Sequence, residues 1–185
     1  LAVQMHGSGI ASNPFTALLG ARFSAGFYVP GHYCPDSERF LPYPDDQPEV
    51  RRNLRLASFL GAPEQGEELE FPILEEDRRE ARAAAPGLSP GNYVCLHPGA
   101  RSPARRWLPE RFAAVADSLA REGLRVVLTG SRAEQPVLRA VMRHMTRPAA
   151  ALGSELSFGG LAALIGGARL VVANDTGVSH LAAAL

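Results

Sequence analysis

The stretch LVVANDTGVSHLAAAL, residues 170–185, carries the clearest fold signal in this sequence. An apolar run leads into a glycine-containing turn and then into a helical pattern, which predicts a buried strand, a tight turn and a helix start. The unpaired backbone N–H groups at such a helix start suit a phosphate or diphosphate. Asp175 or Thr176 is expected to cap the helix, and His180 to lie about one turn further on, within reach of a bound oxygen. The alternative is a capped helix with an ordinary surface histidine.

The whole second half of the chain repeats this alternation of strand and helix. The predicted elements are strand 93–96, helix 109–123, strand 125–129, a helix from Pro136, a helix over 158–165 and strand 170–173. Gly159 and Gly160 weaken the start of the last helix. Three βα units in a row indicate a doubly wound α/β sheet, in which ligands bind beyond the carboxyl ends of the strands.

Composition excludes several classes of protein. The 19 basic residues balance the 19 acidic residues, which argues against a nucleic-acid partner. Cys34 and Cys95 are too far apart for a C-x-x-C site, so we expect no disulfide framework, no metal site and a cytoplasmic location. No apolar run reaches the roughly 18 residues of a membrane span, and no secretory leader is recognisable. The sequence starts at Leu1 and stops within a predicted helix, so we expect a fragment of a longer protein.

The first half of the chain is less regular. It is predicted to contain a strand over residues 2–5 and a helix over 49–60 that Gly61 ends, with proline-marked loops between them. Residues 64–76 are acidic and have no periodicity, which favours a domain boundary there. A chain of 185 residues with 46% hydrophobic side chains is compatible with two small domains. The expected domains are residues 1–68 and residues 69–185.

A second cluster of polar side chains directly follows the strand at 93–96. The sequence HPGARSPARRW, residues 97–107, places Ser102, Arg105 and two further arginines in one loop at the carboxyl edge of the predicted sheet. Guanidinium groups bind phosphate oxygens through paired, charge-assisted hydrogen bonds. The alternative is a solvated basic loop with an arginine packed on Trp107. Two phosphate-binding patterns at one edge of a sheet favour the diphosphate.

Four separated motifs follow one another between residues 93 and 185. They are His97-Pro98-Gly99, Arg105-Arg106-Trp107 with Glu110-Arg111-Phe112, the strand end Val126-Val127-Leu128-Thr129-Gly130 with Glu134, and Asn174-Asp175-Thr176-Gly177 with His180-Leu181-Ala182. Together they resemble glycosyltransferase family 9, the heptosyltransferase family of lipopolysaccharide core assembly. Residues 3–7 and 18–22 resemble the first domain of that family more weakly. The resemblance implies a GT-B architecture of two Rossmann-like, doubly wound domains, both incomplete in this chain.

The resemblance also assigns roles to the two domains and to single residues. It implies that residues 1–68 belong to the acceptor-side domain and residues 69–185 to the domain that binds the nucleotide sugar. Asp175, Thr176, Gly177 and His180 would contact the donor diphosphate, Ser102 and Arg105 would close over it, and Glu134 would contact the ribose. Arg105 stands where family members commonly have lysine, and Leu108 where they usually have proline.

The activity implied by the resemblance is inverting transfer of a sugar, by default heptose from ADP-heptose, to a lipopolysaccharide-type or other glycan acceptor. No metal or other cofactor is implied, and the sequence contains no Asp-x-Asp pair of the kind that holds a divalent ion. The general base of the family is an aspartate in the first strand–helix loop, which we expect upstream of Leu1, so no catalytic residue is assigned. A glycolipid acceptor implies work in the cytoplasm, with peripheral association at the inner membrane.

Other functions fit the sequence less well. Asp175, Ser179 and His180 are neighbours along one predicted helix and cannot form a hydrolase triad. The turn Gly7-Ser8-Gly9 lacks the third glycine of a dinucleotide-binding motif. A sugar-nucleotide epimerase shares the two-domain shape but needs an acid–base pair that the sequence does not show. The main alternative is a non-catalytic module that binds a nucleoside diphosphate as a sensor or scaffold.

Overall fold

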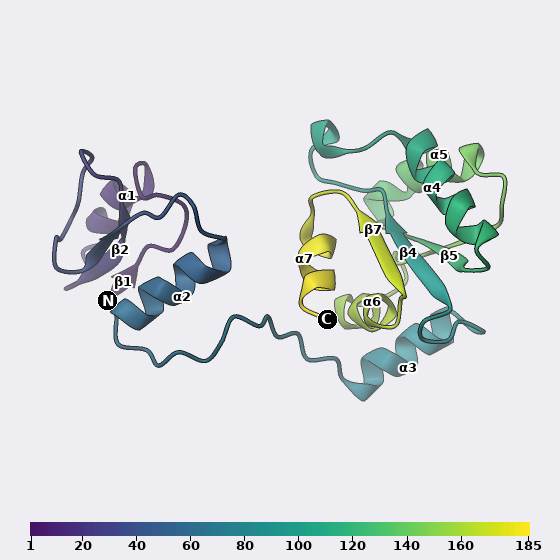
Figure 1. Ribbon diagram of the computed structural model, residues 1–185, viewed down its shortest axis with the longest axis horizontal. Helices are drawn as coiled ribbons and strands as arrows, with labels where there is room; N and C mark the ends of the chain where they lie inside the picture. The colour runs from purple at the N-terminus through teal and green to yellow at the C-terminus, as the bar shows by residue number, and fades with distance from the viewer. The chain divides into compact units, whose positions relative to one another are not determined.

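The computed structural model describes all residues from Leu1 to Leu185. The chain forms two compact units, Leu1–Glu68 and Leu69–Leu185, each with its own parallel β-sheet. Figure 1 shows the first unit in purple to blue and the second in teal to yellow.

The first unit is built on three short strands and two helices. Strands β1 (Ala2–Val3), β2 (Ser24–Tyr28) and β3 (Phe40–Pro42) pair side by side in that order, all parallel. The helices are α1 (Ser12–Leu18) and α2 (Glu49–Phe59). The buried apolar residues of this unit are Ala25, Phe27, Phe40 and Leu56.

The sequence predicts only part of this first unit. The expected helix over 49–60 is confirmed, and Gly61 follows it with a φ of 92°, a conformation that suits glycine after a helix end. The expected strand over 2–5 is confined to its first two residues. Elements α1, β2 and β3 are not predicted. Strand β3 lies in the proline-marked region and ends at Pro42, and α1 holds Pro14 in its first turn, where the missing N–H costs no bond.

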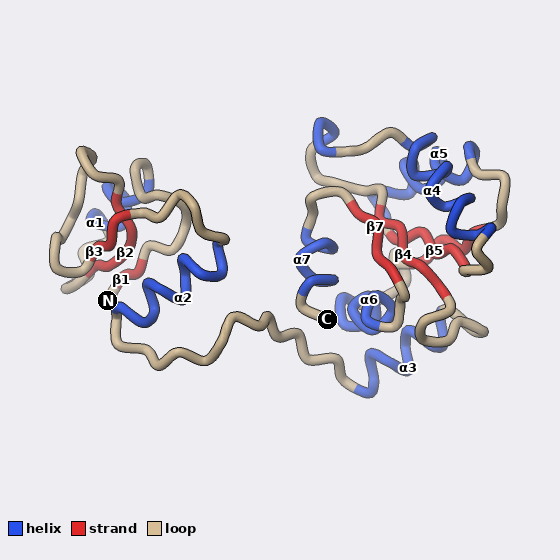
Figure 2. Tube along the Cα trace, in the orientation of Figure 1, coloured by secondary structure: helices blue, strands red, loops and turns tan.

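The second unit contains a four-stranded parallel sheet. Strands β4 (Tyr93–His97), β5 (Arg125–Thr129), β6 (Ala149–Leu152) and β7 (Leu170–Ala173) lie in the order β6-β5-β4-β7. The chain runs from β4 outward to β5 and β6 and then returns to place β7 on the other side of β4 (Figure 2). Strand order therefore reverses at β4, and such a reversal opens a crevice for ligands at the carboxyl ends of the neighbouring strands.

Helices cover both faces of this sheet. Helices α4 (Pro109–Arg121) and α5 (Gln135–His144) pack on the face to which Val94 and Leu96 point. Helices α3 (Glu75–Ala84) and α6 (Phe158–Gly166) pack on the opposite face with Tyr93 and Cys95, and α7 (Gly177–Ala183) packs against α6. Successive strand residues point to opposite faces, so a sheet covered on both sides needs continuous apolar strands such as β4. None of the helices is both long enough and apolar enough to cross a membrane.

The predicted α/β class is confirmed, but the structure adds two elements to the three expected βα units. Strand β6, at the edge of the sheet, has the sequence Ala-Ala-Ala-Leu. Alanine has a low β-propensity, so the sequence does not predict this strand. Helix α3 begins inside the acidic segment 64–76, and its ten residues are mostly charged, with only alanines as apolar residues. A helix of that composition lacks the large apolar stripe by which an amphipathic helix is recognised in a sequence.

The two glycines at the start of α6 have a packing role. The Ser157 hydroxyl caps α6 by accepting a hydrogen bond from the Gly160 N–H at 3.0 Å. Glu80 of α3 accepts hydrogen bonds from the Ser157 N–H, at 2.7 Å, and from its hydroxyl. A Cβ on Gly159 would collide with Asp77, and one on Gly160 with Glu80. The glycines lower the helix propensity of α6 but allow the acidic side chains of α3 to reach its first turn.

Candidate functional site

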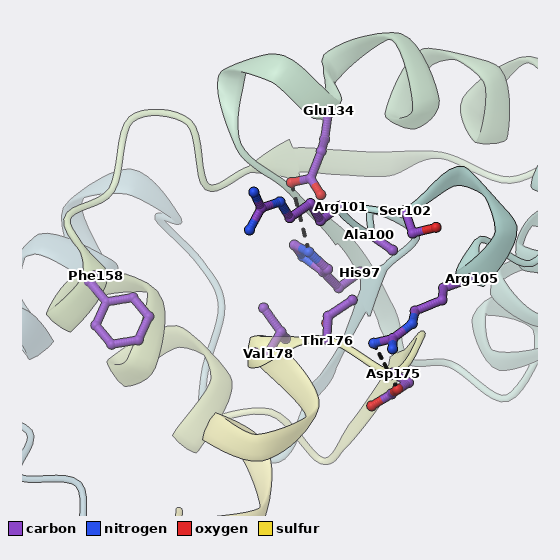
Figure 3. Close-up of a pocket in the computed structure, with 11 residues that line it drawn as sticks. His97, Ala100, Arg101, Ser102, Arg105, Glu134, Phe158, Asp175, Thr176 and Val178 are labelled. Carbon is purple, nitrogen blue, oxygen red and sulfur yellow. Dashed lines mark hydrogen bonds and ion pairs between the residues drawn. The ribbon is translucent and has the colours of Figure 1, made fainter. Parts of the chain in front are cut away.

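A cavity of about 760 Å³ opens at the carboxyl edge of the second sheet. Its walls come from the loops after β4, β5 and β7 and from the starts of α6 and α7 (Figure 3). Its size is typical of sites that bind small molecules and cofactors. The lining residues are His97, Ala100, Arg101, Ser102, Arg105, Glu134, Phe158, Asp175, Thr176, Gly177 and Val178. The cavity therefore lies where the strand order reverses.

The loop after β4 is shaped by its own hydrogen bonds. It contains a short 3₁₀ helix, η1 (Pro103–Arg105), whose first residue is a proline with its φ angle fixed by the ring. Arg106 turns back, and its Nε donates a hydrogen bond to the carbonyl oxygen of Ala100 at 2.8 Å. Arg101 and Ser102 are exposed on the same loop. The loop thus uses one arginine for its own folding and leaves the others at the cavity.

Asn174 joins the loop after β7 to the loop after β4. Its buried amide nitrogen donates to the carbonyl oxygens of Pro98, at 2.9 Å, and Gly99, at 3.2 Å. Its Oδ1 accepts a hydrogen bond from the Trp107 N–H at 3.0 Å. One side chain therefore fixes the separation of two loops that are far apart in the sequence, and with it the width of the cavity.

Arg105 and Asp175 form an ion pair across these two loops, with Nη1 and Oδ2 3.2 Å apart (Figure 3). The two side chains are 65% and 70% exposed. Solvent screens such a pair, so it adds little to folding stability, about 1 kcal/mol at most. The Arg105 guanidinium can therefore exchange this carboxylate for another anion at small cost.

The buried His97 and the half-buried Glu134 form a polar pair at the cavity. His97 Nδ1 lies 3.1 Å from Thr129 Oγ1, and His97 Nε2 lies 3.8 Å from Glu134 Oε2. Burial lowers the pKa of His97 and outweighs the attraction of Glu134, so we assign a neutral ring. Burial raises the pKa of Glu134, but hydrogen bonds from Ser131 and the charge of Arg106 outweigh it, so the pKa lies below its ordinary value. The Glu134 carboxylate is therefore ionised at neutral pH.

Glu134 ends the 3₁₀ helix η2 (Arg132–Glu134) and is held in place by its neighbours. Its Oε2 accepts hydrogen bonds from the Ser131 N–H and hydroxyl, each at 2.8 Å. A Cβ on Gly99 would collide with this carboxylate, so the absence of a side chain there allows Glu134 to lie against the loop after β4. No group of three or more His, Cys, Asp or Glu side chains in the chain is arranged to hold a metal ion.

Helix α7 begins at Gly177, with Thr176 rather than Asp175 at the N-cap position. The Ser179 hydroxyl donates to the Thr176 carbonyl oxygen at 2.7 Å and accepts from the Thr176 N–H at 3.3 Å. The Thr176 Oγ1 atom is buried and has no hydrogen-bond partner in the protein. A buried polar atom without a partner is rare in proteins, and this one belongs to a residue that lines the cavity.

The structure brings six of the seven expected site residues to one cavity: Ser102, Arg105, Glu134, Asp175, Thr176 and Gly177. His180 is the exception, because it lies exposed on α7 and does not line the cavity. The contacts of all seven with a ligand remain predictions.

Four further lining residues have no site role assigned to them individually from the sequence: His97, Arg101, Phe158 and Val178. The first two lie in the strand-end loop 97–107 that the sequence singles out, and Arg101 is one of the three arginines of that loop that are predicted to lie at a phosphate. Phe158 and Val178 read as core residues of helices in the sequence, and only the packing of α6 and α7 turns them toward the cavity.

Comparison with known proteins agrees with this architecture. The sequence model of glycosyltransferase family 9 (heptosyltransferase) matches residues 9–185. Lipopolysaccharide heptosyltransferase 3 of Escherichia coli is 35% identical over 111 residues, which are 58% of this chain and 32% of that protein.

Two solved structures resemble the chain. The glycosyl transferase family 9 protein of Veillonella parvula superposes with a TM-score of 0.74 at 22% identity, covering 92% of this chain and 50% of that one. The Escherichia coli ADP-heptose lipopolysaccharide heptosyltransferase II superposes with a TM-score of 0.58 at 26% identity, covering 72% of this chain and 41% of that one. The chain thus spans about a third of the length of its curated relative and half or less of these structures. The chain therefore carries part of the GT-B fold of these proteins. Because the family model matches nearly the whole chain, including every residue of the cavity, the chain belongs to glycosyltransferase family 9, the heptosyltransferases.

Proposed function

We propose that this protein transfers a sugar from a nucleoside-diphosphate donor, ADP-heptose, to a glycan acceptor of the lipopolysaccharide type. The observation that carries the proposal is the meeting of six expected donor-site residues at one cavity. The name of the E. coli relative, an ADP-heptose lipopolysaccharide heptosyltransferase, supports this choice of donor and acceptor. We assign donor binding to the unit Leu69–Leu185 and part of the acceptor side to the unit Leu1–Glu68.

In this proposal the donor diphosphate lies between Arg105, Ser102 and the start of α7. The guanidinium and the hydroxyl are hydrogen-bond donors at the cavity, and charge-assisted bonds to phosphate are about twice as strong as neutral ones. The Asp175 carboxylate would repel a diphosphate, so its proposed role is to hold the Arg105 guanidinium at the cavity through their ion pair before the donor binds. Phosphate oxygens then replace Asp175 at the guanidinium when the donor binds.

Glu134 is proposed to bind the ribose of the donor. Its lowered pKa keeps the carboxyl ionised, so its oxygens accept hydrogen bonds and donate none. Ribose hydroxyls are donors that fit this requirement. The two hydrogen bonds from Ser131 occupy Oε2 and leave Oε1 for the sugar.

The chemistry required of the site is stabilisation of the leaving group. Negative charge grows on the diphosphate as its bond to the sugar breaks, and donors already aimed at that position lower the barrier. Removing one such donor typically costs about two to three orders of magnitude in rate. We assign this role to Arg105, without a metal ion, in a single displacement that inverts the anomeric carbon. The residue that accepts the proton of the attacking hydroxyl is expected to be an aspartate, and none of the cavity residues is assigned that role.

The proposed acceptor also sets the place of action. A glycolipid of the lipopolysaccharide type exposes its glycan at a membrane surface, so we propose that the enzyme works in the cytoplasm at the inner face of the membrane, by peripheral contact. Release of the chain from washed inner-membrane vesicles by salt would support that contact, since exposed charge interactions are screened.

The donor site is tested by calorimetric titration with ADP, UDP, GDP and pyrophosphate in the presence of a chelator. We expect ADP to bind, and Arg105→Ala to weaken ADP and pyrophosphate alike by about 10-fold or more, the loss of one charged hydrogen bond. Arg139→Ala is the control, because Arg139 is exposed on α5 and does not line the cavity. His180→Ala tests the prediction for the residue that lies outside the cavity.

The transfer step needs a second assay. The chain is mixed with ADP-heptose and a heptose-deficient lipopolysaccharide, and we expect release of ADP and a product whose anomeric configuration, read by NMR, is inverted relative to the donor. Binding of ADP without any transfer would favour the alternative function, a non-catalytic module that binds a nucleoside diphosphate. Failure to bind ADP, UDP, GDP and pyrophosphate would reject the diphosphate site.

A further inference from the structure

Phe158 is an exposed aromatic side chain on the wall of the cavity, and the proposed diphosphate and ribose contacts do not use it. It is the first residue of α6 and is 63% exposed. Figure 3 shows it on the opposite side of the cavity from Arg105 and Asp175, with Val178 and Thr176 between them. The Arg105–Asp175 ion pair therefore lies at one end of the cavity and the Phe158 ring at the other, with Arg101 and Glu134 on the wall between them.

The position of Phe158 is fixed by its surroundings. Ser157, the residue before it, caps α6 and is held in turn by two hydrogen bonds to Glu80. The Phe158 ring packs edge-to-face on Phe71, with centroids 5.5 Å apart and planes at 76°. This contact covers only part of the ring, which leaves open surface beside the cavity. A rigid helix start thus presents a preorganised aromatic ring to a ligand.

We propose that Phe158 stacks on the nucleobase of the donor and gives the site its preference for a purine. The inference rests on the proposed function, because it takes the ligand to be a nucleoside diphosphate. Such a ligand is charged at one end and flat and aromatic at the other, which matches the two ends of the cavity. In Figure 3 Glu134 lies on the wall above Val178 and Thr176, and we place the ribose, which joins base to diphosphate, against that wall. A purine covers more of the ring than a pyrimidine does, so stacking favours ADP over UDP.

The test compares a ligand that has a base with one that has none. We expect Phe158→Ala to weaken ADP binding by about 5-fold or more, the usual size of one base–aromatic stack, and to leave pyrophosphate binding unchanged. The preference for ADP over UDP should shrink in the same variant. Met142→Ala is the control, since Met142 is a partly exposed apolar residue of α5 that does not line the cavity.

Two further variants separate stacking from packing. Phe158→Leu keeps an apolar contact for Phe71 but has no aromatic face, so we expect it to bind ADP as weakly as Phe158→Ala. Phe158→Trp keeps the face and should retain ADP affinity. Its added indole fluorescence should be quenched by ADP and not by pyrophosphate, measured against the parent chain, whose one tryptophan is Trp107.

The outcomes distinguish this inference from the proposed function. If Arg105→Ala loses both ligands while Phe158→Ala keeps full ADP affinity, the diphosphate site stands and the stacking is refuted. If Phe158→Ala weakens pyrophosphate as much as ADP, the ring acts on the shape of the cavity and stacking is again refuted. If the parent chain binds neither ligand, both the proposed function and the stacking are rejected.

Discussion

Asn174→Asp is the sharpest test of how the two loops of the cavity are joined. The substitution keeps the shape of the side chain and the oxygen that accepts from the Trp107 N–H. It replaces the amide nitrogen, which donates to the Pro98 and Gly99 carbonyls, with a carboxyl oxygen. A buried donor thus becomes an acceptor that faces two other acceptors.

The cost follows from those contacts. Two hydrogen bonds are lost, each worth about 1 kcal/mol net, and the buried carboxylate beside two carbonyl oxygens adds roughly 1 kcal/mol more at neutral pH. We therefore expect the free energy of unfolding to fall by about 3 kcal/mol at pH 8. When the new carboxyl is protonated it donates one bond again, so the loss at pH 4 should be only about 1 kcal/mol.

The sign of the pH dependence is fixed by the same geometry. Burial and the facing carbonyls raise the folded-state pKa of the new carboxyl above its unfolded value of about 3.9. The protonated form is thus favoured in the folded state, and the penalty grows as pH rises from that unfolded value through the folded pKa.

The assay is urea unfolding of the parent and the variant at pH 4, 6 and 8, followed by tryptophan fluorescence. Trp107 is the one tryptophan of the chain and lies at the contact, so the signal reports on the second unit. Asn92→Asp is the matched control, because Asn92 is exposed and its Oδ1 accepts a hydrogen bond from the Ser89 N–H, which a carboxylate also accepts. The reasoning is refuted if Asn174→Asp unfolds like the parent at pH 8, or if Asn92→Asp loses as much stability.

Three other outcomes are expected. Gly99→Ala should push aside the Glu134 carboxylate and lower both stability and ADP affinity. Gly177→Ala is the comparison, because its methyl group meets open space, and it should fold as stably as the parent. Urea unfolding measures the stability of the two variants, and calorimetry measures their ADP affinity. Burial lowers the pKa of His97 in the folded chain, so the unfolded chain takes up a proton first as pH falls below about 6.5, and the parent should lose stability there. His97→Gln should lack this dependence of the free energy of unfolding on pH between pH 7.5 and 5.5. The same pH dependence in parent and variant would contradict the burial argument. Burial raises the pKa of Cys95, in β4, to about 12, so an aromatic disulfide reagent should label only Cys34 in the native chain and both thiols in urea. Fast labelling of both thiols in native buffer would contradict the burial of Cys95.

Much of the second unit can be predicted from the sequence because its signals are local. Strands β5 and β7 are predicted over the residues they occupy, and α4 is predicted to within two residues. Each has a strong apolar pattern and clear start and stop residues. Strand β6 and helix α3 are missed because an alanine-rich edge strand and a charge-rich helix carry no such pattern. These two elements are recognisable only by what they pack against.

The candidate site divides in the same way. The loops after β4 and β7 are predicted because each directly follows an apolar strand and carries side chains suited to phosphate in one short segment, such as Arg105 and Thr176. In the loop after β5, Glu134 is nominated only by the family resemblance. His180 is also nominated by a local motif, yet the packing of α7 leaves it outside the cavity. The aromatic end formed by Phe158 has no local motif at all.

The sequence by itself determined the class of fold, the strand-end loops and the family. Tertiary structure alone decided that β7 returns beside β4, that Asn174 bonds the two loops together and that Phe158 faces Arg105 across one cavity. The physical reason is that the pairing of β4 with β7 and the hydrogen bonds of Asn174 join residues 67 to 76 positions apart, and their energy depends on which surfaces meet. A local pattern records the preference of a segment for helix or strand, but it does not record the partner that the segment finds.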